Sequence, residues 1–497
     1  MAFGVAFEPN NLLMCFIGVL FGTLVGVLPG LGPTATIALL LPITFDLSPV
    51  ASVIMLSGVY YGAYYGGTTT SVLVNIPGEA ATVVTCLDGY QMAKKGRAGP
   101  ALGISALGSF IGGSFAMVML VFLAPPFASM ALKFGGPERA ALIFFGLTMV
   151  TYLSSGPLLK SLMMAGVGLL LGCIGTDVIT GSQRYTMGLM GLSDGLGIVP
   201  VVMGLFGISE VFLNVERSSE KMQVFKTRVR ELLPSRKDWK VSSGPIARGS
   251  IVGFFIGLLP GGGGILASFL SYAMEKRLSK HPERFGTGEI QGVAGPETAN
   301  NAGAQATFIP LLTLGLPCNA TLAVLMGAFM IHGITPGPLL MKAHPELFWG
   351  VVGSMYLGNA MLVLLNLPLI PLWIKVLKIP YHLFFPLILL ICVIGSYSLQ
   401  NSVFDIMIMI GCGVIGYLMK KWGYEAAPLV LALVLGPMFE ESLHQSLIMS
   451  GGSALVFISR PIAATLVFIS LALLIYPVIC WALRRERSTV QVLRSED

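Results

Sequence analysis

Long apolar segments alternate with short polar ones along almost the whole chain. The apolar segments approach the ~20 residues that a helix needs to cross a membrane. Crossing helices are predicted in the following segments: Ala51–Leu87, Ala101–Leu123, Ala140–Leu153, Leu162–Ile179, Leu196–Leu213, Glu297–Ile331, Leu347–Ile374, Leu383–Tyr397, Phe404–Met419, Ala427–Phe439 and Ala454–Leu483. Ala51–Leu87 is expected to be interrupted at Gly66-Gly67 and at Pro77-Gly78, and a Pro-rich loop with Pro125 and Pro126 is expected after Ala101–Leu123. This pattern predicts an all-α polytopic membrane protein.

Two further apolar segments are interrupted at their centres by proline and glycine. One is Gly18–Pro42, broken at Pro29, and the other is Gly249–Ala273, broken at Pro260 and the run Gly261–Gly264. Proline clashes with the preceding helical turn, and glycine makes a helix costly. Each segment is therefore predicted to form a helical hairpin, two short helices joined by a non-helical tip.

The two hairpins align with each other without a gap. The matching pairs are Gly18 with Gly249, Gly22 with Gly253, Gly26 with Gly257, Pro29 with Pro260, Gly30 with Gly261 and Gly32 with Gly263. Further along, Asn75–Ala80 resembles Gly315–Ala320, and Arg97–Leu102 resembles Thr335–Leu340. Glycine-broken segments at matching places in two halves indicate the binding site of a transporter built from repeats.

Composition strengthens the membrane interpretation. The chain is 55% hydrophobic and only 11% charged, whereas soluble domains carry about 25% charged residues. The net charge of +6 comes from loops and the C-terminus and does not indicate nucleic-acid binding. The seven cysteines are scattered singly, so neither a metal site nor a disulfide is expected. No Lys or Arg precedes the first apolar run, so a cleaved signal peptide is not expected.

The distribution of Lys and Arg predicts the orientation. Residues 1–50 contain neither, whereas the segment 216–248 contains nine and the C-terminal tail is also basic. The positive-inside rule then places the N-terminus outside and the C-terminus in the cytoplasm. Basic residues flank both ends of Gly249–Ala273, which predicts that this hairpin is re-entrant and opens to the cytoplasm. The first hairpin is predicted to open outside.

Hairpins that open on opposite sides predict two inverted-topology repeats, each with a glycine-tipped re-entrant hairpin and broken helices. The predicted division is an N-terminal transmembrane repeat (1–215), a basic cytoplasmic linker (216–248), a C-terminal transmembrane repeat (249–445) and an additional C-terminal helix with a basic tail (446–497). Inverted repeats give one fold two mirror-related conformations and hence alternating access.

The hairpin tips are candidate sites for an anionic substrate. Glycine leaves backbone amides open, and a helix N-terminus carries about half a positive charge. The candidates are Gly30, Gly32 and Thr34 in the first tip and Gly261, Gly262, Gly263 and Gly264 in the second. The alternative is that these glycines only allow close helix packing.

A second pair of breaks is more polar. The residues predicted to contact substrate there are Asn75, Pro77, Gly78, Asn300, Asn301, Pro317 and Asn319. Oxygens of Thr68, Thr69, Thr70, Asn75 and Asn300 are candidate Na⁺ ligands, because unwound carbonyls beside hydroxyl and amide oxygens suit this ion. Threonine can also bond back within its own helix. Glu79 and Glu297 lie in the broken regions and are functional candidates as intramembrane carboxylates.

Several of these motifs resemble one known family. GVLPGLGPTATIALLLP, YGGTTTSVLVNIPGE, GLLPGGGG and GPETANNA, together with the large basic central loop, are similar to the large membrane subunit of bacterial tripartite tricarboxylate transporters, the TctA family. The resemblance spans about residues 10–480. It implies an inner-membrane importer of citrate-like carboxylates without a resident cofactor, coupled to a Na⁺ gradient. It also implies a small membrane subunit and a periplasmic solute-binding protein as partners; a homodimer is left open.

Other classes of function fit the sequence less well. An intramembrane enzyme needs a nucleophile with a base or two facing aspartates, and neither Asp177, Asp194 nor Ser453 has a convincing partner. A passive anion channel would not need inverted hairpins. The sequence therefore favours a transporter whose hairpin-bearing part moves against a scaffold, as in an elevator.

Overall fold

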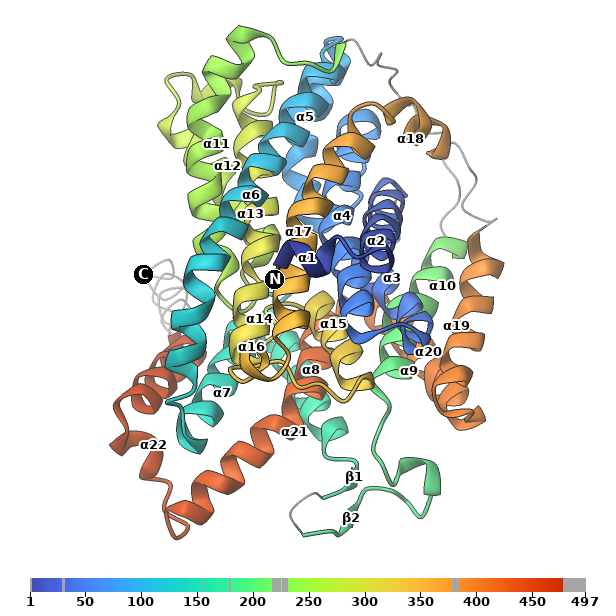
Figure 1. Cartoon of the computed structure of the whole chain (residues 1–497), viewed down its shortest axis with the longest axis vertical. Helices are drawn as coiled ribbons and strands as arrows, with labels where there is room; N and C mark the ends of the chain where they lie inside the picture. Colours follow the sequence, from blue (N-terminus) through green and yellow to red (C-terminus); the bar gives the residue numbers. More distant parts are fainter. Residues whose placement is uncertain are drawn as a thin grey trace, which may run out of the picture.

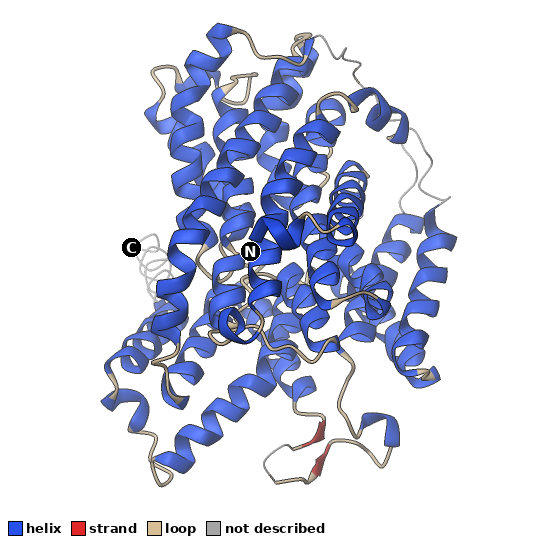
Figure 2. Cartoon of the chain, viewed as in Figure 1, coloured by secondary structure: helices blue, strands red, loops and turns tan. Residues whose placement is uncertain are grey.

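The computed structural model of the chain is built almost entirely of helices (Figure 1), and its only strands within the described residues form one two-stranded pair (Figure 2). The structure describes residues 2–28, 32–154, 156–177, 180–216, 225, 231–377 and 384–476. Within these ranges, six helices are long and apolar enough to cross a membrane: Pro9–Val27, Ala98–Ala131, Ile198–Glu216, Pro345–Asn366, Val403–Lys421 and Ala426–Met449. This is the architecture of a multi-pass membrane protein.

The first half of the chain ends at a continuous helix formed by α9, the π-helical η4 and α10. Its elements are α1 (Ala2–Ala6), α2 (Pro9–Val27), α3 (Pro33–Leu40), η1 (Leu41–Asp46), α4 (Pro49–Val74), η2 (Ala80–Thr82), α5 (Val83–Lys94), α6 (Ala98–Ala131), α7 (Gly136–Leu153), α8 (Leu158–Gly172), β1 (Gly175–Thr176), β2 (Gln183–Arg184), η3 (Met190–Leu192), α9 (Ile198–Val202), η4 (Met203–Ile208) and α10 (Ser209–Glu216). The two strands are antiparallel, with Gly175 opposite Arg184.

The second half begins with another pair of helices joined by a glycine-rich tip. Its elements are α11 (Arg236–Gly257), α12 (Gly263–Leu278), η6 (Pro282–Arg284), α13 (Gln291–Ala306), α14 (Phe308–Leu314), α15 (Ala320–Ile331), α16 (Leu340–Ala343), α17 (Pro345–Asn366), α18 (Ile370–Val376), α19 (Phe384–Gln400), α20 (Val403–Lys421), α21 (Ala426–Met449) and α22 (Val456–Ser459). A further apolar helix covers Pro461–Tyr476.

Helix α2 packs on α4 through glycines at every fourth position, Gly18, Gly22 and Gly26. A Cβ added at any of them would lie closer than 3.0 Å to a backbone carbonyl of α4, which real side chains do not tolerate. The carbonyls belong, in order, to Met55, Val59 and Ala63. These glycines let the two backbones touch, as small residues do between membrane helices.

Helix α11 packs on α13 with the same spacing. Its contact residues are Gly249, Gly253 and Gly257, and an added Cβ would meet the backbone carbonyls of Gly295, Ala299 and Gly303 within 3.0 Å. Glycines predicted from the sequence to match in pairs therefore make equivalent contacts in the two halves.

The long helices α6 and α17 each lie against the other half of the chain. Helix α6 packs on α13, where Gly112 meets the backbone of Thr298, and α17 packs on α2 and α4, where Gly358 meets the ring of Tyr61. The helices α2, α4, α5, α6, α11, α12, α13 and α17 thus form one interleaved central body.

A peripheral group of helices flanks this central body. Helices α7 and α8 pack on α21, and α20 packs on α9, η4 and α10. The peripheral group meets the rest of the molecule through the short elements α3, η1 and α15 (Figure 1) and through the break after α14, where Leu316 packs in one cluster with residues of α7, α8 and α21. A limited connection of this kind separates the molecule into two packed groups.

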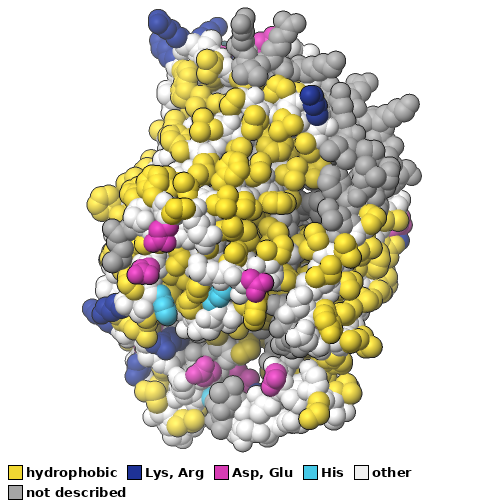
Figure 3. Space-filling view, turned by 45° about the vertical axis from the view of Figure 1, so that its right-hand side comes forward, with side chains coloured by type: hydrophobic (Ala, Val, Ile, Leu, Met, Phe, Trp, Pro, Cys, Tyr) yellow, Lys and Arg dark blue, Asp and Glu magenta, His cyan; other side chains and the backbone are white. Residues whose placement is uncertain are grey.

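Hydrophobic side chains cover much of the face shown in Figure 3, with Lys and Arg at its upper end and charged side chains of both signs scattered over its lower half. At one end, Arg97 at the start of α6 pairs with Asp238 in the first turn of α11 at 2.5 Å. Burial would raise the pKa of the Asp238 carboxyl, but hydrogen bonds from Ser235 and Arg97 lower it below its usual range. At the same end, Asp88 accepts backbone N–H bonds from Gly286, Gly288 and Glu289 at 2.7–2.9 Å.

Two local expectations differ from the structure. Helix α4 runs without interruption through Gly66 and Gly67, where the sequence suggested a break; an added Cβ at Gly66 would clash with the backbone of Thr23, so this glycine serves close packing. Helix α6 likewise continues through Pro125 and Pro126, where a loop was expected. In both places helix packing in the folded molecule outweighs the local helix-breaking tendency.

Candidate functional site

The chain leaves regular helix at two matching places, after α4 and after α14. Helix α4 ends at Asn75 in the left-handed region with φ 63°, and α14 ends at Gly315 with φ 71°. After each break a new helical segment begins, with its first amides capped by a side chain. Glu79 accepts from the amide of Ala81 at 2.7 Å, and Asn319 accepts from the amide of Leu322 at 2.9 Å.

The predicted residues Pro77 and Pro317 lie within these two breaks, where a missing N–H costs no helical bond. Gly78 approaches the hairpin helix α2, since a Cβ there would clash with the backbone of Gly26. The first break therefore contacts the end of the hairpin helix α2.

The side chain of Glu297 is the centre of a buried polar cluster. It is 0% exposed and lies in α13, and Thr68 of α4 donates to its Oε2 at 2.7 Å. Thr85 of α5 donates to its Oε1, and the amide of Asn300 donates to Oε2 at 3.3 Å. No Lys or Arg pairs with Glu297 in the part of the chain that the structure describes. A buried carboxyl group that is held only by neutral donors lacks the charge partner that an ionised group in a dry interior requires.

Asn301 extends this cluster toward α6. Its amide donates to the Asn300 Oδ1 at 2.6 Å, to the Ser109 hydroxyl at 2.8 Å and to the carbonyl of Glu297 at 3.1 Å. Its own Oδ1 is buried and accepts no hydrogen bond. Asn300 and Asn301 lie inside a continuous helix rather than in an unwound segment. A ligand could therefore be contacted by their side chains but not by their backbone carbonyls.

The second hairpin tip reaches the break that follows α14. The amide of Gly261 donates to the carbonyl of Cys318 at 2.7 Å. Within the tip, Gly262, Gly263 and Gly264 are buried, and Gly264 packs so closely against the ring of Tyr64 that a Cβ there would overlap it. The Asn319 amide, which donates to Tyr60 Oη at 2.9 Å, lies beside Gly263.

The first hairpin tip is described only in part. Gly30 lies outside the described residues, whereas Gly32 precedes α3 and is partly exposed. The hydroxyls of Thr34 in α3 and Thr321 in α15 lie 2.6 Å apart. The first hairpin therefore contacts α15, the helix after the second break. The tip of the second hairpin contacts that break itself, through Gly261 and Cys318.

The three threonines predicted to bind Na⁺ do different things. Thr68 donates to Glu297, while Thr70 donates to the carbonyl of Val27 at 2.8 Å and ties α4 to the end of α2. Thr69 is buried at 2% exposure. The structure thus brings Thr68, Asn300 and Asn301 together around Glu297, and it places Asn75 at a helix end as a backbone turn.

Sequence reasoning did not single out Tyr60, Thr85 or Ser109, which complete the site. Tyr60 and Tyr64 stand one helical turn apart in the YYGAYYGG segment, a spacing that indicates one helix face. Nothing local marks Thr85 or Ser109, because their partner Glu297 lies far away in the sequence.

A helical body with six membrane-length helices among the described residues and buried polar side chains in its interior is the architecture of a multi-pass membrane protein. A family model described as "Tripartite tricarboxylate transporter TctA family" matches residues 12–431. The chain belongs to the TctA family, and it is therefore a membrane component of a transport system rather than an enzyme.

Two curated relatives come from Agrobacterium vitis. An uncharacterized 52.8 kDa protein in the TAR-I ttuC' 3'region is 52% identical over 492 residues, which cover 99% of this chain and 98% of the relative. An uncharacterized protein in the TAR-II ttuC' 3'region is 51% identical over 240 residues, 48% of this chain and 99% of the relative. No solved structure matches the chain.

Proposed function

We propose that the chain is the large membrane subunit of a binding-protein-dependent secondary transporter that imports citrate-like di- or tricarboxylates together with Na⁺. One observation carries the proposal: the buried carboxylate of Glu297 lacks a cationic partner among the described residues and stands beside Thr68, Thr85 and Asn300. A Na⁺ ion between these oxygens would neutralise Glu297, and the neutral site would then accept a carboxylate substrate.

The two halves act as inverted repeats in this proposal. The support is that α2 on α4 and α11 on α13 make the same contacts through every fourth residue. The breaks after Asn75 and Gly315 match in the same way, with the cap at Glu79 corresponding to the cap at Asn319. The repeat boundaries at residues 215, 248 and 445 remain part of the proposal.

Both hairpins are re-entrant in this proposal. Arg248, in the middle of α11, pairs with Glu275 near the end of α12 at 2.8 and 2.5 Å and holds the two arms of the second hairpin together. The apolar part of α12, Gly263–Ala273, would span about 16 Å as a helix, and the eight residues of α3 about 12 Å. Neither of these returning arms approaches the ~30 Å hydrocarbon core, whereas the first arm of the first hairpin, α2, is long enough to cross it.

The substrate carboxylates would lie at the tips, against backbone amides of Gly261–Gly264 and near the side chains of Asn319 and Thr34. The amides of Gly261 and Gly262 already donate to the carbonyls of Cys318 and Leu259, so the carboxylate would be bound mainly by the amides and the helix dipole at the start of α12, at Gly263 and Gly264. Movement of the central body along the peripheral group would then expose this site to each side in turn, as in an elevator. The narrow connection through α3, η1 and α15 supports a movement of this kind.

The proposed partners are those of the family: a small membrane subunit and a periplasmic binding protein. The proposed location is the bacterial inner membrane, with the N-terminus outside. On the side proposed as external, the loop that carries β1 and β2 extends from the helices (Figure 1). Its side chains Met187 and Met190 are 89% and 93% exposed, which suits contact with a protein partner.

Uptake of labelled citrate by the complete three-component system tests this function. In proteoliposomes that contain both membrane subunits, we expect saturable uptake that requires the loaded binding protein and an inward Na⁺ gradient. Uptake without the binding protein, or uptake that persists when the Na⁺ gradient is collapsed, would contradict the proposal. Flux that rises linearly with citrate would instead identify a channel.

The sidedness of the loop after α12 tests the re-entrant hairpin. In a variant without the native cysteines, a single cysteine replaces the exposed Lys280, and an impermeant thiol reagent is applied. We expect labelling only after the cells are permeabilised. Cysteine at the exposed Gln183 in β2 is the control and should react in intact cells. Reaction of both positions in intact cells would show that Gly249–Ala273 crosses the membrane completely, and the two halves would then not be inverted repeats.

A further inference from the structure

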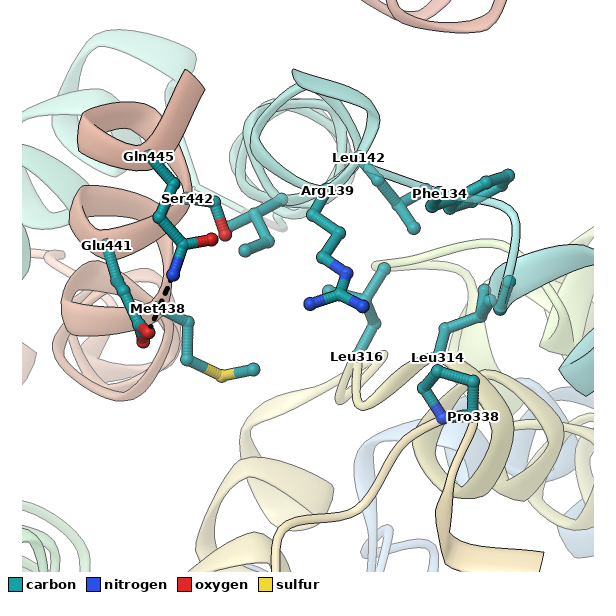
Figure 4. Close-up of a pocket in the computed structure, with 12 residues that line it drawn as sticks. Phe134, Arg139, Leu142, Leu314, Leu316, Pro338, Met438, Glu441, Ser442 and Gln445 are labelled. Carbon is teal, nitrogen blue, oxygen red and sulfur yellow. Dashed lines mark hydrogen bonds between the residues drawn. The ribbon is translucent and has the colours of Figure 1, made fainter. Parts of the chain in front are cut away.

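A cavity of about 140 Å³ opens between the peripheral group and the second break. One water needs only ~15 Å³, so the cavity can hold a small organic ion. Its walls come from the end of α6, the start of α7, the end of α14, the loop before α16, and α21 (Figure 4). It lies apart from the Glu297 cluster, none of whose residues line it.

The guanidinium of Arg139 extends into this cavity (Figure 4). Two nearby arginines are held by carboxylates: Arg184 by Glu440 at 2.6 Å and Arg460 by Glu138 at 3.2 Å. Arg139 makes no ion pair within the described ranges of the chain. It is thus a cation that is available to a ligand.

The rest of the lining would strengthen the binding of a carboxylate. Arg139 is exposed to solvent, and Leu142, Leu316 and Met438 line the same cavity. Its planar guanidinium can form a charge-assisted bidentate pair with a carboxylate. Ser442 and Gln445 of α21 bring a hydroxyl and an amide to the same cavity. The one acidic wall residue, Glu441, accepts from Gln445 at 3.0 Å and lies on the far side of Met438 from Arg139 (Figure 4).

The cavity adjoins the segment that leads to the hairpin tip. Leu316 forms part of its wall, and Cys318, two residues further on, accepts the hydrogen bond from Gly261. The break after α14 therefore lies between the Arg139 cavity and the tip of the second hairpin.

We propose that this cavity is a separate carboxylate-binding site on the proposed external side, with Arg139 as its anchor, where substrate binds before it moves to the hairpin tips. The site rests on the proposed transport of carboxylates. Binding there raises the local concentration of substrate next to the closed tip and selects for an ionised carboxylate group.

Protection of an introduced cysteine measures binding at this site without any need for transport. The full chain, in membranes and without its native cysteines, carries Ser442→Cys, and the rate of its reaction with a thiol reagent is measured with and without citrate or succinate. We expect either anion to slow the reaction about tenfold at saturation, and R139Q to remove the protection. Lys133→Gln, an exposed cation outside the cavity, is the matched control and should leave the protection unchanged.

The kinetics of the complete system give a second readout. We expect R139Q to raise the KM for citrate uptake about tenfold with little change in kcat, R139K to restore part of the affinity, and E441Q to leave KM equal or lower. An equal rise in KM in R139Q and K133Q would overturn the site. So would normal citrate uptake by the Ser442→Cys protein if citrate and succinate do not slow the reaction of its cysteine with the thiol reagent. The cysteine could be protected in an Arg139-dependent way although uptake proves not to be coupled to an ion. That result would support the binding site and contradict the proposed function.

Discussion

Substituting glutamine for Glu297 is expected to abolish Na⁺-driven accumulation of substrate. The carboxylate is fully buried, and it accepts hydrogen bonds from Thr68, Thr85 and Asn300. Glutamine keeps the size of the side chain but removes the charge that a bound Na⁺ would neutralise. The loss of a charged ligand in a buried site is expected to weaken Na⁺ binding by about a hundredfold, or roughly 2.7 kcal/mol.

The measurement is the dependence of citrate uptake on Na⁺ concentration, compared between the native chain and E297Q. The control is Glu346→Gln, which removes an exposed carboxylate from the first turn of α17 and should leave uptake and its Na⁺ dependence intact. Size-exclusion profiles of both variants establish that each is folded. A folded E297Q protein whose Na⁺ dependence equals that of the native chain would exclude Glu297 as the coupling group.

Valine at Gly253 is expected to separate α11 from α13 and to destabilise the whole second hairpin. The added Cβ would overlap the backbone carbonyl of Ala299, and neither backbone can yield without moving a helix. Overpacking of side chains alone costs ~1–3 kcal/mol, so a clash between two backbones is expected to cost at least about 3 kcal/mol. The apparent melting temperature should fall by on the order of 5 °C or more.

Thermal unfolding of purified variants, followed by the loss of the monodisperse peak, measures this effect. The control is Gly166→Val in α8, where an added Cβ meets nothing within 4 Å. The equivalent substitution in the first half, Gly22→Val, should destabilise the protein to a similar degree, because Gly22 meets Val59 as Gly253 meets Ala299. A native melting temperature for G253V would show that the two helices are not in contact.

The sequence by itself determined the class of fold and the position of its main features. The length and spacing of the apolar runs predicted a multi-pass helical protein, because a spanning helix must bond all its backbone groups internally. Proline and glycine act within a few residues, so Pro77, Pro317 and the run Gly261–Gly264 identified the ends of helices correctly. The motifs also predicted the family, which the comparison confirmed.

Only the tertiary structure decided which helix-breaking residues actually break a helix. Gly66 lies within α4 because it allows close contact with Thr23, and Pro125 lies within α6. A local rule cannot anticipate either outcome, since a neighbouring helix stabilises the conformation that the rule disfavours.

The tertiary structure alone also decided which polar groups meet. Glu297 is joined to Thr68 and Thr85 from helices more than two hundred positions away, and Arg139 shares a cavity with α21 and the break at Leu316. Hydropathy and spacing describe one segment at a time. The contacts between segments follow from how helices pack, which fixes distances that no single stretch of sequence contains.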